Sequence, residues 1–87
     1  MWILQKIANG NMSCENSDLD SLQIEEVEKL LINEFGEKIE DEHILISWDC
    51  WSGIYIMLNP GFDNYESSNS LIERIYQLLI RKWSNKS

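Results

Sequence analysis

The stretch HILISWDCWSGIYIML (residues 43–58) decides the fold expected for this chain. It contains two short runs in which apolar side chains recur at every second position, and Gly53 lies in the link between them. Alternation of this kind is typical of half-buried strands, and a short glycine-containing link favours an antiparallel hairpin. The face expected to be buried consists of Ile44, Ile46, Trp48, Ile54, Ile56 and Leu58. We therefore expect a hairpin over residues 43–59, ended by the Asn59-Pro60-Gly61 turn signal.

An amphipathic helix is expected before the hairpin, over residues 21–35. Asp20 and Gln23 have the spacing of a capping box, and Gly36 is placed to end the helix. Its apolar stripe, at helical spacing, is Ile24, Val27, Leu30, Leu31 and Phe35. Residues 37–42 (EKIEDE) are expected to be a charged link to the hairpin.

A second amphipathic helix is expected after the hairpin, over residues 70–83. Ser70 and Glu73 have the capping-box spacing, which predicts that the preceding residues, 62–69, form a loop. The apolar arc is wide, because Tyr76 and Ile80 flank the main stripe of Ile72, Ile75, Leu79 and Trp83. Such an arc leaves open a homodimer formed through this helix.

The amino-terminal segment allows two interpretations. Residues 2–8 (WILQKIA) are apolar and partly β-branched, which favours a strand, and a short partner strand over residues 11–14 would follow a turn. The spacing of Ile3 and Ile7 would also suit a turn of helix. With the strand interpretation the element order is β(β)αββα. That order predicts one α+β domain over residues 1–87, in which two amphipathic helices pack on an antiparallel sheet with a central hairpin.

The charge of the chain narrows the classes of partner. Fifteen acidic and seven basic residues give a net charge of −8. Residues 13–43 carry a net charge of −9, whereas residues 71–87 carry +3. Such a field repels nucleic acids and anionic membranes, and it speeds encounter with a cationic protein. The alternative interpretation is a solvated acidic surface that serves only solubility.

Residues for catalysis or metal binding are not evident in the sequence. His43 is the only histidine, and Cys14 and Cys50 lack the paired spacing of a zinc site. Asn16, Asp18 and Asp20 have the spacing of the first ligands of a calcium loop, but the turn glycine and the closing glutamate of such a loop are absent. We therefore expect no enzyme activity, no cofactor and no metal. The chain shows no secretion signal or membrane span, which predicts a cytoplasmic protein with two free thiols.

Partner-binding residues are expected on the first helix and on the hairpin. On the helical wheel, Ile32 lies outside the apolar stripe, next to acidic positions. Trp51 lies in the hairpin turn, where folding alone does not require its burial, whereas Trp48 is expected in the core. The candidate residues are Glu25, Glu26, Glu28, Ile32, Asp49, Trp51 and Tyr55.

Two β-rich runs between amphipathic helices, together with the acidic stretch 15–42, resemble the small acidic immunity proteins of bacterial toxin systems, including those of contact-dependent inhibition. The resemblance implies a cytoplasmic protein that neutralises one toxin, often a nuclease, by covering its active site or a nearby surface. It assigns no individual residue. A phage-type inhibitor that mimics DNA is an alternative, although the acids here are concentrated before residue 43. A self-associating structural module is another.

Overall fold

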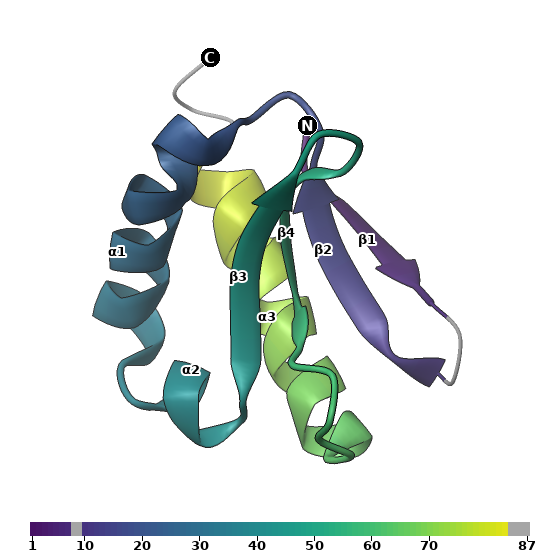
Figure 1. Cartoon of the computed structure of the whole chain (residues 1–87). Coiled ribbons are helices and arrows are strands. Elements are labelled where there is room, and N and C mark those ends of the chain that lie inside the picture. Colours follow the sequence, from purple (N-terminus) through teal and green to yellow (C-terminus); the bar gives the residue numbers. More distant parts are fainter. Residues whose placement is uncertain (8–9, 84–87) are drawn as a thin grey trace.

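The computed structural model describes residues 1–7 and 10–83 and shows helices packed on one face of a four-stranded sheet (Figure 1). The strands are β1 (Ile3–Lys6), β2 (Met12–Asn16), β3 (Ile44–Asp49) and β4 (Gly53–Leu58). All neighbouring strands are antiparallel, and their order across the sheet is β1-β2-β4-β3. The α+β class, the antiparallel sheet and the predicted order of elements are confirmed.

The predicted hairpin forms the β3–β4 half of this sheet. Ile46 pairs with Ile56 and Trp48 with Ile54, so the apolar sides of both strands lie on the same face. The shorter hairpin of β1 and β2 forms the other half, with Leu4 paired to Cys14. The helical alternative for the amino-terminal segment is therefore wrong. The predicted end of its first strand, near Ala8, lies outside the described residues.

The first helix begins and ends where the sequence predicts. A 3-10 turn, η2 (Ser21–Gln23), leads into α1 (Ile24–Phe35). The Asp20 carboxylate accepts a hydrogen bond from the backbone N–H of Leu22 (2.9 Å), and the Gln23 side chain accepts one from that of Asp20 (3.0 Å). Both capping-box positions are thus satisfied, and Gly36 ends α1 with a φ of 60°.

The predicted link 37–42 is not wholly irregular, because it contains the one-turn helix α2 (Lys38–Asp41). Ile39, the single apolar residue of this charged segment, is buried. One buried side chain thus folds the segment back against the end of α1 and the start of β3.

The second long helix, α3 (Tyr65–Lys82), begins five residues before its predicted start. The expected capping box of Ser70 and Glu73 is wrong, since both residues lie inside the helix. The predicted loop 62–69 is therefore mostly helical. Tertiary contacts of its polar side chains account for the difference. Asn64 donates to the backbone carbonyl of Glu42 (3.1 Å), and the Ser67 hydroxyl donates to the Glu42 carboxylate (2.9 Å).

The core lies between the helices and the inner face of the sheet. It consists of Trp2, Cys14, Val27, Leu31, Ile39, Ile54, Ile56, Leu71, Ile72, Ile75, Leu78 and Leu79. The side chains of Tyr76 and Ile80 also pack against it, so the wide apolar arc of α3 is used within the molecule. Trp48 differs from expectation, with 37% of its surface exposed. It lies on the edge strand β3, where no further strand covers its outer flank.

Candidate protein-binding surface

Trp51 projects from the turn between β3 and β4 with 87% of its surface exposed. The turn is held from within, because one carboxylate oxygen of Asp49 accepts hydrogen bonds from the backbone N–H groups of Trp51 (2.8 Å) and Ser52 (2.6 Å). Gly53 follows with a φ of 69°, and a β-carbon at this position would collide with the backbone of Asn16. The exposed tryptophan thus stands on a fixed turn anchored to β2.

The loop that follows β2 lies beside this turn. The 3-10 turn η2 packs against both β3 and β4, and Leu22 within it is 84% exposed. The chain's amino group reaches the same place, where it pairs with the Asp18 carboxylate (2.8 Å). Figure 1 shows the amino terminus close to the β3–β4 turn. We call this end of the molecule the hairpin-tip surface; it comprises Met1, Asp18, Asp20, Leu22, Trp48 and Trp51.

The first turn of α1 extends the hairpin-tip surface with two predicted residues, Glu25 and Glu26. Both side chains are exposed and lie in the first helical turn after η2. The Glu25 carboxylate forms an ion pair with Lys29 one turn along the helix (3.2 Å). Carboxylates suit this end of a helix, because the backbone N–H groups of the first turn carry partial positive charge. The position of Glu25 and Glu26 is therefore also explained by their favourable interaction with the amino-terminal end of α1, independently of a role in binding.

The remaining predicted residues lie elsewhere. Glu28 is partly buried one turn further along α1, and Ile32 is exposed near the opposite end of that helix. Tyr55 points to the sheet face that carries no helix, where it lines a shallow hollow of about 320 Å³ with Glu15 and Asp49. The seven candidates thus do not form one surface. Asp49, Trp51, Glu25 and Glu26 lie at the tip or in the first turn of α1, whereas Glu28 lies further along α1, Ile32 near its far end and Tyr55 on the open sheet face.

Sequence reasoning missed Leu22 and Trp48 as members of the hairpin-tip surface. Leu22 could have been found, since it lies on the polar side of the helical wheel of the first predicted helix. Trp48 could not, because strand alternation assigns it to the helix-covered face and says nothing about how far the helices extend over it.

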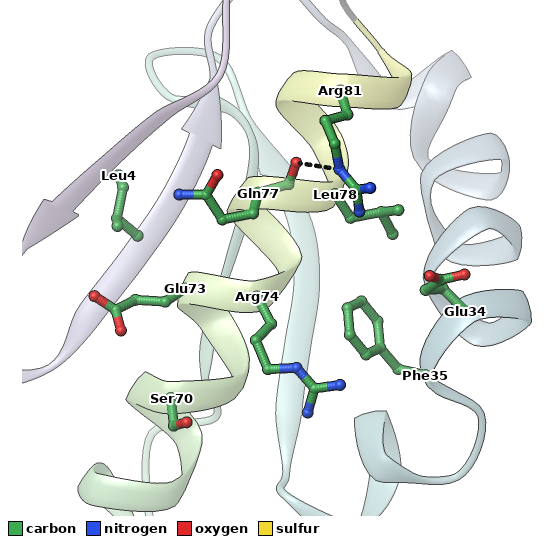
Figure 2. Close-up of a pocket in the computed structure, with 9 residues that line it drawn as sticks. All are labelled: Leu4, Glu34, Phe35, Ser70, Glu73, Arg74, Gln77, Leu78 and Arg81. Carbon is green, nitrogen blue, oxygen red and sulfur yellow. Dashed lines mark hydrogen bonds between the residues drawn. The ribbon is translucent and has the colours of Figure 1, made fainter.

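A second hollow, of about 460 Å³, follows the outer side of α3 (Figure 2). Its charges are mixed: Glu34 and Glu73 line it together with Arg74 and Arg81. The Arg74 guanidinium lies over the Phe35 ring, 5.4 Å from its centroid, and so links α3 to α1. Alternating charge of this kind favours no single class of ligand, in contrast to the acidic first half of the chain.

The cysteines and the histidine form no nucleophilic arrangement among the described residues. Both cysteines are free; Cys14 is buried in β2, and Cys50 is exposed in the hairpin turn. Burial, with a smaller effect of the neighbouring Glu15 carboxylate, raises the pKa of the Cys14 thiol to about 12, which keeps it protonated. The His43 ring stacks on Phe62 with a centroid separation of 3.7 Å.

Within residues 1–7 and 10–83, no three His, Cys, Asp or Glu side chains lie close enough together to hold a metal ion. The helices of that part of the chain also include none long and apolar enough to cross a membrane. Comparisons with protein-family models, with curated proteins and with solved structures find no match to this chain.

Proposed function

We propose that this protein is a non-enzymatic inhibitor that binds a cationic protein through the hairpin-tip surface. In its specific form, it is a cytoplasmic immunity protein that neutralises a bacterial toxin such as a nuclease. The observation that carries the proposal is the exposure of Trp51 on a turn whose conformation is fixed by Asp49 and Gly53.

A fixed, exposed tryptophan suits binding for two physical reasons. Its large apolar surface gains free energy when a partner covers it, and tryptophan is enriched among residues that dominate binding energy. A turn that is already ordered loses little conformational entropy on association, so more of that gain appears as affinity. Leu22 and Trp48 add exposed apolar surface at the same end of the molecule.

Carboxylates beside the tryptophan favour a basic partner. Asp20, Glu25 and Glu26 lie on the loop and the helical turn that adjoin the tip, and the whole chain carries a charge of −8. A protein that acts on nucleic acid needs a cationic surface for the phosphates, and an acidic protein complements that surface. Long-range attraction would raise the association rate, while the covered tryptophan would slow dissociation.

Self-association through α3 is a weaker candidate, because Tyr76 and Ile80 already pack against the core. DNA mimicry is the closer rival, since it uses the same carboxylates. It would require them to take the place of phosphates over most of one face, whereas here Trp51, Leu22 and Trp48 lie among them. This apolar content favours a protein-specific contact.

The proposal is tested by affinity capture with matched baits, followed by a growth assay. Wild-type protein and Phe62→Ala, which changes an exposed aromatic residue on the loop after β4, should retain the same basic partner. Trp51→Ala should lose it. Co-expression of wild type, but not of Trp51→Ala, should then restore growth of cells that produce the captured protein. Equal capture by Trp51→Ala, or a captured protein whose toxicity is unaffected, would refute the proposal.

A further inference from the structure

The corner between α1 and α2 lies at the end of the molecule opposite the hairpin tip (Figure 1). The side chains at this corner line a small hollow. Gly36 makes the corner: it ends α1 with a φ of 60°, and its backbone N–H donates to the Ile32 carbonyl (2.8 Å). The hollow has a volume of about 260 Å³, and its lining residues are Ile32, Gly36, Glu37, Ile39 and Glu40.

The hollow is apolar at its base and open above Gly36. Ile39 is almost completely buried, whereas Ile32 is 56% exposed. A β-carbon at Gly36 would meet no atom within 4 Å, so the space beside the backbone is free. Ile32 also lines a neighbouring hollow with Leu30 and Asn33, which makes its side chain a ridge between two depressions.

The rim of the corner is negative. The carboxylates of Glu37 and Glu40 are exposed, and neither lies within ion-pair distance of a cation in the described part of the chain. Lys38, although adjacent in sequence, does not reach them. Two unpaired carboxylates above an apolar base match a ligand that is aliphatic at one end and cationic at the other.

We propose that this corner binds the side chain of an arginine or lysine presented by a protein partner. The aliphatic stem lies against Ile32 and Ile39, and the cationic end meets the carboxylates of Glu37 and Glu40. An anionic group would be repelled by the rim. A wholly apolar side chain would leave the carboxylates without a partner while partly removing them from water. The site is separate from the hairpin-tip surface and does not depend on the function proposed for it.

Propylguanidinium, which reproduces the end of an arginine side chain, is a suitable probe for NMR titration of the ¹⁵N-labelled protein. We expect saturable shifts of the Gly36 and Ile39 backbone amides. At matched ionic strength, guanidinium alone and propanol alone should bind at least about threefold more weakly, because each has only half of the required chemistry. If guanidinium alone bound as tightly as propylguanidinium, the apolar base would contribute nothing to binding, and the proposal would be overturned.

Substitutions of the lining residues test whether propylguanidinium binds at this corner. Glu37→Gln combined with Glu40→Gln should weaken propylguanidinium binding by about threefold or more, and Ile32→Ser should also weaken it. The matched control is Asp63→Asn with Glu66→Gln, which removes the same charge from exposed positions outside the corner. A similar loss in the control, or shifts that gather away from the corner, would also refute the inference. No partner protein enters this titration, so its failure would leave the capture test of Trp51 unaffected.

Discussion

Replacing Gly53 by alanine tests how the hairpin turn is fixed to the rest of the molecule. At a φ of 69° any other residue is strained, which costs about 1–2 kcal/mol. The added β-carbon would also collide with the Asn16 carbonyl oxygen and with Ser17, both of them backbone that cannot move without disturbing the end of β2. We expect a total loss of about 3 kcal/mol or more in the free energy of unfolding.

Urea denaturation followed by circular dichroism measures this loss. With a urea m-value of about 1–2 kcal/mol/M for a domain of this size, the midpoint should fall by about 1.5 M or more. Gly10→Ala is the matched control, because Gly10 has a similar φ of 79° but a β-carbon at that position would meet no atom within 4 Å. It should lose only about 1–2 kcal/mol. If both variants lost the same stability, the close approach of the hairpin to β2 would not exist in solution.

Three further predictions concern single side chains. Trp51→Ala should change the free energy of unfolding by less than about 0.5 kcal/mol, because the side chain is exposed. Trp2→Ala, which leaves a cavity at a buried site, should lower it by about 3–5 kcal/mol. Thermal and urea denaturation of both variants measure the difference. Asp49→Ala should cost about 1–2 kcal/mol and broaden the amide resonances of the turn, since two backbone N–H groups lose their acceptor; unchanged resonances would show that the turn is held by other contacts. The thiol of Cys14, with a pKa raised from 9.0 to about 12, should resist iodoacetamide at pH 8 while Cys50 reacts. Because the unfolded chain ionises that thiol first, stability should fall as pH rises from 9 towards 12, and Cys14→Ala should lack this component of the slope.

Local sequence patterns predicted the β3–β4 hairpin and the first helix, because in both the apolar spacing within the element itself determines which face is buried. The alternation in residues 44–58 places Ile46 and Ile56 on one face of a hairpin, and the Asp20–Gln23 box begins the first helix as expected. The start of α3 could not be found in this way. Ser70 and Glu73 have the local pattern of a helix start. The Asn69 side chain, however, accepts a hydrogen bond from the backbone N–H of Met12 (2.9 Å), a residue far away in sequence, and such tertiary contacts stabilise an earlier start.

The candidate surface was predictable in its parts but not in its assembly. A tryptophan in a tight hairpin turn is expected to be exposed, and the acidic positions of α1 follow from its helical wheel. That the segment carrying Asp18 and Leu22 lies near the hairpin depends on the pairing of β2 with β4, which joins distant parts of the chain. Sequence periodicity carries no information about that pairing.

The strand order β1-β2-β4-β3 also bears on how the chain folds. Each half of the sequence supplies a hairpin followed by a helix, and the two hairpins join through the pairs that connect β2 to β4, such as Cys14 with Ile56. Contacts within a hairpin are local and form in microseconds, whereas this central junction must wait for the halves to meet. Until then β2 and β4 each expose an unpaired edge, and at high concentration the matching edge of a second molecule competes for it. Exchange of halves between two chains would reproduce the pairing of β2 with β4, so refolding should be most efficient in dilute solution.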